Sequence, residues 1–519
     1  MMSTPETVRI PMRDGVELGA SLYHPKAASR GLLLARGPYG RGRMFAGIVT
    51  PFVRHGYTVL LVSSRGTADS GGAFDPMRTE PDDGQDTVGW MRTQPWYPGR
   101  FATFGGSYLG HTQWALLEDP PADLVTSIIT VGPHDFARHA WGSGSFNLDF
   151  IGWSDMIISQ RTSSTLGAIR KLMTAGRRLA PILNATPLAY GAVAHAGAEA
   201  PWMRDRLTRS DIDDPYWAPM RHATALEKVT TPVLLISGWQ DLFVSQSFAQ
   251  YARLRERGIP VGLLAGPWTH TQVGRTDGAL VTQRMLAWVD HHLADAPAPA
   301  EGPVQIGVTG PKRRRTDWQR HAVWPPAGSD RTFHLGAEGR LSATPTADPG
   351  ATAGFTYDPE EPTPAVGGPV LMGGGYVDDS SLAAREDVLA FTGGPLTRDT
   401  VVAGAPVVTL AHRSQHPDAD LFIRVSDVDE RGHSRNLCEA YRRLPVDRDD
   451  APVRIELGPL AHRFAAGHRI RLLVAGGSFP QFPRNAGTGE NPLTATVRVA
   501  NTHTIGLAGS ALTLRTLGG

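Results

Sequence analysis

The sequence predicts an α/β domain built on a doubly wound sheet, a helical cap inserted into that domain, and a C-terminal all-β domain of the jelly-roll kind. Three observations lead to this prediction. Short, continuous apolar runs recur in the first part of the chain, far enough apart for helices between them. A tryptophan- and methionine-rich segment with roughly helical spacing interrupts them. Many short strand-like runs with Gly and Pro between them fill the rest.

The chain opens with two strand-like runs, Val8–Met12 and Val16–Tyr23. Asp14-Gly15 separates them, and Asp-Gly between such runs is a hairpin signal. Six continuous apolar runs follow, and this pattern is typical of parallel strands that are covered on both faces. These runs are Gly31–Ala35, Tyr57–Ser63, Phe101–Phe104, Leu124–Val131, Pro232–Ser237 and Val261–Ala265.

The domain boundaries follow from the changes in pattern. We expect the α/β domain over residues 1–134 and 228–296, and the helical cap over residues 135–227. The amphipathic stretch Thr282–Leu293 and the Pro/Ala linker Ala296–Ala300 end the α/β domain. The jelly roll is expected over residues 303–519. Its predicted strands are Val304–Val308, Thr332–Leu335, Asp387–Phe391, Pro406–Leu410, Asp420–Val425, Asn436–Arg442, Val453–Leu457, Ile470–Val474, Thr494–Val499 and Ala511–Leu514.

The composition excludes several classes of protein. A chain of 519 residues is too long for a single binding module. Its 51 Lys+Arg and 50 Asp+Glu give a net charge of +1, so no overall field attracts nucleic acid or an anionic membrane. The longest apolar runs fall far short of the roughly 18 residues of a membrane span. We expect a soluble protein with no nucleic-acid partner and no membrane partner.

Other features bear on location and cofactors. The N-terminus lacks the basic and apolar parts of a secretory signal, and Cys438 is the only cysteine, which fits a reducing cytoplasm. A secreted form that has lost its leader would look the same. Asp290-His291-His292 lacks metal-ligand spacing, and no dinucleotide fingerprint follows a strand, so neither a metal nor a cofactor is expected. The basic run Lys312–Arg315 is interpreted as a solvated loop.

A glycine-flanked serine follows the run Phe101–Phe104, in the motif Gly105-Gly106-Ser107-Tyr108-Leu109-Gly110. A helix-compatible stretch, His111–Leu117, comes next. A strand, a sharp turn and a helix form a nucleophile elbow, which exposes the serine hydroxyl beside the positive end of the helix. The strict G-x-S-x-G form is not met, because Leu109 stands at the final glycine position. A plain Gly-Ser turn is the alternative interpretation.

A serine hydroxyl becomes a good nucleophile when a histidine takes its proton and a carboxylate orients that histidine. In α/β-hydrolases the order along the chain is Ser, acid, His, each just after a strand. Asp241 lies four residues past the run ending at Ser237, and His270 lies five past Ala265. Ser107, Asp241 and His270 are therefore predicted to form a catalytic triad.

Such a site needs two hydrogen-bond donors for the oxyanion of the tetrahedral intermediate. The backbone N–H of Tyr108, next to the nucleophile, is one candidate. The loop after Gly31–Ala35 reads Arg36-Gly37-Pro38-Tyr39-Gly40 and has no HGGG run, so the hydroxyl of Tyr39 is the available second donor. A packing role for Tyr39 is the alternative.

These motifs resemble those of the cocaine esterase and X-Pro dipeptidyl-peptidase family (CocE/NonD type), which also contains α-amino acid ester hydrolases and cephalosporin acylases. The resemblance covers nearly the whole chain. It implies an α/β-hydrolase with a helical cap and a C-terminal jelly roll. It also implies that Ser107, Asp241 and His270 match the triad, and that Tyr39 and the Tyr108 amide match the oxyanion donors. The motifs are Arg36-Gly37-Pro38-Tyr39, Ser64-Arg65-Gly66, Gln94-Pro95-Trp96, Gly105–Gly110, Gly238-Trp239-Gln240-Asp241, Gly266-Pro267-Trp268-Thr269-His270 and, near the C-terminus, Gly477-Ser478-Phe479-Pro480 with Arg484-Asn485 and Thr488-Gly489.

The resemblance leaves the substrate open. Some relatives hold a substrate ammonium with carboxylates, for which Asp149, Asp155, Asp205 and Asp211 are candidates, although solvated roles are the alternative. Aromatic residues instead suggest an apolar acyl pocket, with packing as the alternative. The candidates are Trp141, Phe146, Phe150, Trp153, Trp239 and Trp268.

We therefore expect a serine hydrolase that cleaves carboxylic esters, or activated amides, through an acyl-enzyme. An X-Pro dipeptidyl-peptidase and an acyltransferase with the same triad are alternatives. A non-catalytic binding protein built on the jelly roll is a third. The expected partner is a small-molecule ester or amide, and the sequence leaves open whether the chain forms a homodimer.

Overall fold

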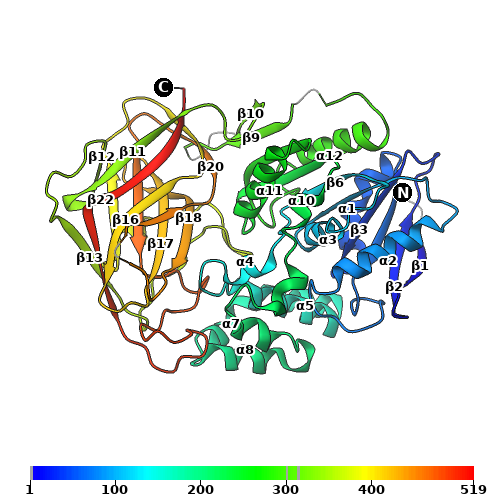
Figure 1. The fold of residues 1–519 in the computed structure, drawn as a ribbon, viewed down its shortest axis with the longest axis horizontal. Coiled ribbons are helices and arrows are strands. Elements are labelled where there is room, and N and C mark those ends of the chain that lie inside the picture. Colours follow the sequence, from blue (N-terminus) through cyan, green and yellow to red (C-terminus); the bar gives the residue numbers. More distant parts are fainter. Residues whose placement is uncertain (1–3, 300–301, 312–315, 450, 519) are drawn as a thin grey trace.

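The computed structural model describes residues 4–299, 302–311, 316–449 and 451–518. It consists of an N-terminal α/β domain with a helical layer beneath it and a C-terminal all-β domain at its side (Figure 1). The basic run Lys312–Arg315 lies outside the described residues.

The α/β domain is built on a ten-stranded mixed sheet, with the strand order β1-β2-β4-β3-β5-β6-β7-β8-β9-β10. The predicted hairpin at the N-terminus is confirmed: β1 and β2 are antiparallel and Ile10 pairs with Leu18. From β4 through β9 the neighbouring strands are parallel. The strands are β1 (Glu6–Pro11), β2 (Glu17–Tyr23), β3 (Leu32–Gly37), β4 (Thr58–Ser63), β5 (Phe101–Gly106), β6 (Leu124–Thr130), β7 (Val233–Gln240), β8 (Val261–Thr269), β9 (Val304–Val308) and β10 (Asp317–His321).

Helices cover both faces of this sheet, which explains its continuous apolar strands. On one face, α1 (Arg43–Arg54) and α12 (Gly278–Leu293) pack over a core that includes Phe104 and Trp268. On the other, α2 (Glu80–Arg92), α3 (Tyr108–Leu116) and α11 (Val244–Glu256) pack over a second core. The carboxyl ends of the parallel strands lie at one edge of the sheet, where the residues that follow them can form a site.

The segment between β6 and β7 is helical, and its helices labelled α5, α7 and α8 lie at the bottom of the molecule in Figure 1, whereas α10 lies beside α11 of the α/β domain. Its own aromatic core includes Phe136, Trp141, Phe146 and Trp217, which explains the tryptophan-rich sequence. The helices are α4 (Phe136–Trp141), α5 (Asp149–Thr162), α6 (Thr165–Met173), α7 (Ala175–Leu183), α8 (Leu188–Ala196), α9 (Met203–Thr208) and α10 (Ala225–Lys228), with 3-10 turns at Gly197–Glu199 and Pro215–Met220.

The C-terminal domain is a twelve-stranded, mainly antiparallel β structure with one short helix, α13 (Ser380–Ala383). Alternate residues of its strands point into a common apolar core, where Cys438 is buried as predicted. The strands are β11 (Ser329–Gly336), β12 (Arg340–Ser342), β13 (Thr352–Tyr357), β14 (Val388–Gly393), β15 (Thr400–Gly404), β16 (Val407–Ser414), β17 (Asp420–Val428), β18 (Ser434–Arg443), β19 (Val453–Glu456), β20 (Leu460–Phe464), β21 (Arg469–Ala475) and β22 (Asn501–Leu517).

Two predicted strands are corrected by the structure. Val304–Val308 was expected in the β domain, but β9 pairs in parallel with β8 and so belongs to the α/β sheet. An apolar run of this kind fits a strand of either sheet. Because the Pro/Ala linker directly precedes it, the sequence wrongly predicts that the β domain begins at this strand. The second, Thr494–Val499, is not a strand. The long strand β22 starts just after it, at Asn501.

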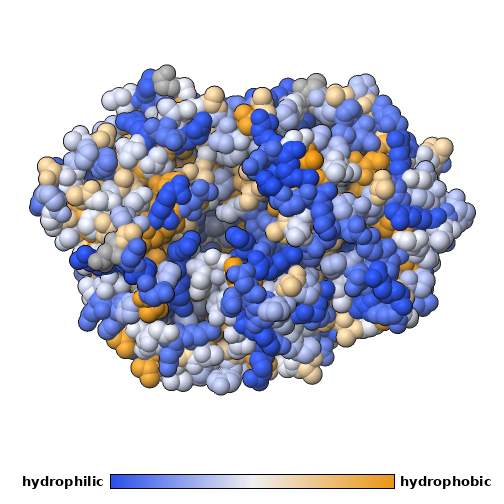
Figure 2. All heavy atoms as spheres, viewed as in Figure 1, coloured by the Kyte–Doolittle hydropathy of each residue, from blue (hydrophilic) through white to orange (hydrophobic). Residues whose placement is uncertain are grey.

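The face of the molecule in Figure 2 is mostly hydrophilic, with single apolar residues scattered over it. A hollow near its centre separates the β domain from the α/β domain (Figure 2). Among the described helices, none is both long and apolar enough to cross a membrane.

Candidate active site

Ser107 lies in a tight turn between β5 and α3. Its φ of 59° falls in the left-handed region, which is rare for a side chain larger than glycine and is typical of strained functional turns. Ser107 N–H donates to the Thr130 carbonyl at 2.9 Å, which fixes the turn against β6. In this motif the final glycine comes one residue later than in G-x-S-x-G, at Gly110. A Cβ at Gly110 would lie 2.6 Å from Cα of Gly132. Close packing of α3 against the end of β6 therefore requires the glycine at this position.

Ser107, His270 and Asp241 form a continuous hydrogen-bonded chain. His270 Nε2 lies 2.9 Å from Ser107 Oγ, and His270 Nδ1 lies 2.6 Å from Asp241 Oδ1. The other carboxylate oxygen of Asp241 accepts a hydrogen bond from the Phe243 N–H at 3.1 Å. The Asp241 side chain is fully buried and the imidazole is 8% exposed. A carboxylate at Nδ1 favours the tautomer with its proton there, which leaves Nε2 free to accept the serine proton.

The hydroxyl of Tyr39 lies beside this chain. Burial raises the pKa of Tyr39, whereas hydrogen bonds to Trp153 and Ser107 lower it. Trp153 Nε1 donates to the Tyr39 oxygen at 3.2 Å. Because this contact uses a lone pair of the phenol oxygen, the phenol O–H can act as the donor in the hydrogen bond with Ser107.

Tyr108 supplies the backbone N–H next to Ser107, and a buried carboxylate holds its side chain. The Tyr108 hydroxyl donates to Glu80 Oε1 at 3.0 Å and accepts from the Met77 N–H at 2.6 Å. The pKa of Tyr108 is raised well above its usual value, first by burial and then by the charge of Glu80. The neighbouring ring of Trp153 stacks on that of Tyr108, with centroids 6.1 Å apart.

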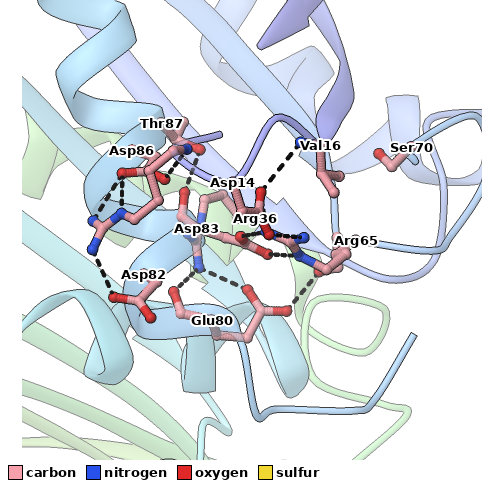
Figure 3. Close-up of polar contacts among 12 residues, drawn as sticks. Asp14, Val16, Arg36, Arg65, Ser70, Glu80, Asp82, Asp83, Asp86 and Thr87 are labelled. Atoms are coloured by element: carbon pink, nitrogen blue, oxygen red, sulfur yellow. Dashed lines mark hydrogen bonds and ion pairs between the residues drawn. The ribbon is translucent and has the colours of Figure 1, made fainter. Parts of the chain in front are cut away.

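Glu80 also binds the strand that leads to Tyr39. Its Oε2 accepts from Arg36 Nη2 at 2.7 Å, and its Oε1 accepts from Ser64 at 2.8 Å. Figure 3 shows Arg36 and Arg65 beside the acidic first turn of α2, where carboxylates are also stabilised by the helix dipole. One buried carboxylate thus connects Tyr108 with the end of β3, three residues before Tyr39.

A small cavity of about 30 Å³ opens at Ser107 under the helical segment. Its wall includes Tyr39, Tyr108 and His270, together with two of the six predicted pocket aromatics, Phe150 and Trp153. A cavity of this size holds about two water-sized groups. The arrangement suits a small acyl group next to the hydroxyl of Ser107.

The other four predicted pocket aromatics are corrected, because they pack elsewhere. Trp239 lies in the sheet core and donates to the Gly307 carbonyl at 2.8 Å. Trp268 is fully buried on the α1–α12 face of the sheet and hydrogen-bonds Asp277. Trp141 and Phe146 pack inside the helical segment. Aromatic side chains are common both in buried cores and in ligand pockets, so the sequence alone does not distinguish a packing residue from a pocket residue.

Of the four candidate carboxylates, only Asp149 lies in the cavity wall. Its Oδ2 accepts from the Leu371 N–H at 3.0 Å, and burial raises its pKa to about 6. Asp155 is paired with Arg178 and His195. Asp205 is paired with Arg209 on the surface, and Asp211 caps a turn at Asp213.

Sequence reasoning missed several residues of the cavity wall. Leu242 and Phe243 follow Asp241 directly, and that position was the available signal. His139 faces the cavity from α4, and burial lowers its pKa to about 3, so it is neutral at pH 7. Leu371 comes from the C-terminal domain, about one hundred residues after His270, and nothing in the sequence indicated it.

The C-terminal domain also holds the loop of Asp241. The neighbouring Gln240 donates from Nε2 to the Leu437 carbonyl at 2.6 Å, and its Oε1 accepts from Asn436 at 3.3 Å. Both partners belong to β18. The β domain therefore contributes Leu371 to the cavity wall and supports Gln240 through β18.

Comparisons with known proteins agree with this architecture. Residues 14–272 match the model of the X-Pro dipeptidyl-peptidase (S15 family), and residues 300–511 match that of the X-Pro dipeptidyl-peptidase C-terminal non-catalytic domain. The chain is 29% identical to cocaine esterase of Rhodococcus sp. (strain MB1 Bresler), over 94% of this chain and 93% of the relative. It is 26% identical to a putative serine esterase of Mycobacterium bovis, over 91% and 90%.

Solved structures share the fold. An α-amino acid ester hydrolase superposes with a TM-score of 0.84 at 23% identity, covering 99% of this chain and 96% of that one. An aminopeptidase from a marine sediment archaeon, Thaumarchaeota archaeon, gives 0.82 at 22% identity with the same coverage. The chain belongs to the cocaine esterase and X-Pro dipeptidyl-peptidase (S15) family and is a serine hydrolase of that family.

Proposed function

We propose that this protein hydrolyses carboxylic esters with a small acyl group, using Ser107 as nucleophile, His270 as general base and Asp241 to orient His270. The observation that carries the proposal is the hydrogen-bonded chain from Ser107 Oγ to the buried carboxylate, with distances of 2.9 and 2.6 Å. This geometry suits proton transfer at the moment of attack.

In the proposed reaction Ser107 Oγ attacks the ester carbonyl carbon and its proton passes to His270 Nε2. The Tyr108 N–H and the Tyr39 hydroxyl stabilise the oxyanion. Collapse of the intermediate breaks the bond to the alkoxy oxygen, which takes the proton from His270 and leaves as the alcohol. Water, deprotonated by His270, then attacks the acyl-enzyme; the bond to Ser107 Oγ breaks, His270 returns the proton to this oxygen, and the acid is released.

Two alternatives share this chemistry. An X-Pro dipeptidyl substrate would place a whole dipeptide on the acyl side, and a cavity of about 30 Å³ favours a smaller group. Transfer to an alcohol or amine instead of water would use the same acyl-enzyme, and analysis of the products with competing acceptors separates it from hydrolysis.

A second candidate is hydrolysis of small amino-acyl esters. Asp149 favours it, because a carboxylate in the cavity wall with a single hydrogen bond, from Leu371 N–H, can accept a substrate ammonium.

The decisive experiment is labelling with a fluorophosphonate probe together with the Ser107→Ala variant. We expect stoichiometric labelling of Ser107 and a loss of kcat on p-nitrophenyl acetate by roughly 10⁴–10⁶-fold, with unchanged thermal unfolding. Full esterase activity of the Ser107→Ala protein would refute the proposal.

A further inference from the structure

A second, larger cavity also reaches Ser107. It has a volume of about 410 Å³ and lies between α1, α12 and the ends of β5 and β6. Ser107 and His270 line both this cavity and the small one under the helical segment. The reacting hydroxyl and imidazole therefore stand between two separate spaces of very different size.

The oxyanion donors lie on one side only. Tyr39 and Tyr108 line the small cavity, and neither is among the described residues that line the large one. The ester carbonyl must place its oxygen at these donors, so the acyl group belongs on their side. The leaving oxygen must instead reach His270 Nε2, which supplies its proton. The group attached to that oxygen then extends toward the large cavity.

The wall of the large cavity is mainly apolar. Its side chains include Phe52 and Ile48 of α1 and Val281 and Met285 of α12. Ile48 is 38% exposed, although most large apolar side chains of the protein are buried. The loop after His270 adds Val273, and the exposed Arg275 provides a charged side chain. Such a wall gains free energy by covering an apolar group.

One residue in the wall of this cavity has a strained backbone conformation. Val131, at the end of β6, has a φ of 44°, which is rare for a β-branched residue. Its N–H donates to the Ile236 carbonyl at 2.7 Å, which fixes it in place. Conformations of this kind are kept where the surrounding structure requires them, often beside functional groups.

We propose that the α1–α12 cavity binds the leaving group of the ester, and that the preferred substrates join a small acyl group to a bulky, apolar, uncharged alcohol. This inference rests on the proposed function of the Ser107 site and adds the class of substrate.

Two isomeric esters test it, cyclohexylmethyl acetate and ethyl cyclohexanecarboxylate. They contain the same atoms and release primary alcohols of similar basicity, but carry the ring on opposite sides of the ester. We expect kcat/KM to be at least about tenfold higher for cyclohexylmethyl acetate. An equal or reversed preference would overturn the inference.

A cavity-filling variant locates the effect. Thr282 of α12 lines the cavity, and its neighbour Gln283 is exposed and lies outside the wall. We expect Thr282→Trp to lower kcat/KM for cyclohexylmethyl acetate about tenfold or more, and to change that for ethyl acetate less than about threefold. The matched control Gln283→Trp should change neither. Equal losses of kcat/KM for both esters would instead indicate that the cavity admits water to the site, and would overturn the inference.

Labelling by a fluorophosphonate counts the folded active sites of each variant. If Thr282→Trp does not fold, Ile48→Trp fills the same cavity from α1 and is expected to have the same selective effect. Absence of labelling in the unchanged protein would refute the proposed function itself. Full labelling with no change in selectivity in either variant would refute only the leaving-group site.

Discussion

Glu80 accepts a hydrogen bond from the hydroxyl of Tyr108 at 3.0 Å, so a buried carboxylate on α2 holds the residue whose backbone N–H we propose as an oxyanion donor. The same carboxylate binds Arg36 at 2.7 Å. Because Arg36 lies next to the end of β3, the strand that leads to Tyr39, both proposed oxyanion donors depend on one side chain.

We therefore expect Glu80→Gln to act on catalysis as well as on stability. Displacement of the donors should lower kcat by about 10- to 100-fold with little change in KM. Arg36 loses its charged partner, so the free energy of unfolding should fall by up to about 3–5 kcal/mol. Steady-state kinetics, normalised to active sites titrated with a fluorophosphonate, measures the first effect, and thermal unfolding measures the second.

Asp82→Asn is the matched control, because Asp82 lies in the same helical turn and makes an exposed ion pair with Arg13. Such pairs contribute about 0–1 kcal/mol, so this variant should resemble the parent. If Glu80→Gln lowered only the number of active sites and not kcat per site, a purely structural role for Glu80 would be established.

Tyr39→Phe removes the proposed side-chain donor and should lower kcat by roughly 10²–10³-fold. Trp153→Phe keeps an aromatic ring in place but removes the N–H that orients the Tyr39 hydroxyl, and we expect a smaller loss of about tenfold. Kinetics on p-nitrophenyl acetate compares the two. Tyr97→Phe, which removes a hydroxyl bonded to Asp123 and absent from both cavity walls at Ser107, is the control. Equal activity of Tyr39→Phe and Tyr97→Phe would exclude Tyr39 as a donor.

Asp149 provides a pH test for amino-acyl substrates. Its raised pKa of about 6 means that the carboxyl is neutral below that pH and charged above it. A substrate ammonium, whose pKa is about 7.7–8.0, stays protonated between pH 5 and 7. We expect the ratio of kcat/KM for alanine ethyl ester to that for ethyl isobutyrate to rise through about pH 6.

Taking this ratio removes the pH dependence that the hydrolysis of both esters shares, and His139 stays neutral over the same range because burial lowers its pKa to about 3. In Asp149→Asn the ratio should be low and independent of pH. A ratio that rises equally in the parent and in the variant would show that Asp149 does not contact the ammonium.

Gly110→Ala tests the packing behind the elbow. Its Cβ would lie 2.6 Å from Cα of Gly132, so the backbones of α3 and β6 must separate, at a cost of about 1–3 kcal/mol. Gly89 of α2 is exposed with nothing within 4 Å of an added Cβ, and Gly89→Ala should stabilise the protein by roughly 0.5–1 kcal/mol. Chemical denaturation measures both changes, and equal effects would contradict the close approach.

Much of the fold could be predicted from the sequence, because continuous apolar runs and an Asp-Gly turn have few structural solutions. Ser107, Asp241 and His270 each follow such a run, and in the structure they are hydrogen-bonded to one another. The strand β9 was assigned to the wrong domain, because an isolated apolar run carries no information about its partner strand.

The wall of the site was less predictable. Trp239 and Trp268 lie next to the motifs of the site, yet both point into cores, because their strands direct successive side chains to opposite faces. Leu371 reaches the cavity through the docking of a second domain, and contacts of that kind have no local pattern. Glu80 looked like an ordinary acidic residue at a helix start, and its link to Tyr108 depends on tertiary packing.

Hydrogen bonds join Leu371 to Asp149 and β18 to Gln240, so residues of both domains hold the active site in place. Heat or denaturant that loosens the β domain would break the contacts of β18 with Gln240, next to the catalytic Asp241 proposed above, while the parallel sheet is still intact. We expect hydrolysis to cease before the secondary structure is lost, so that the contact between the two domains limits the catalytic lifetime of the enzyme.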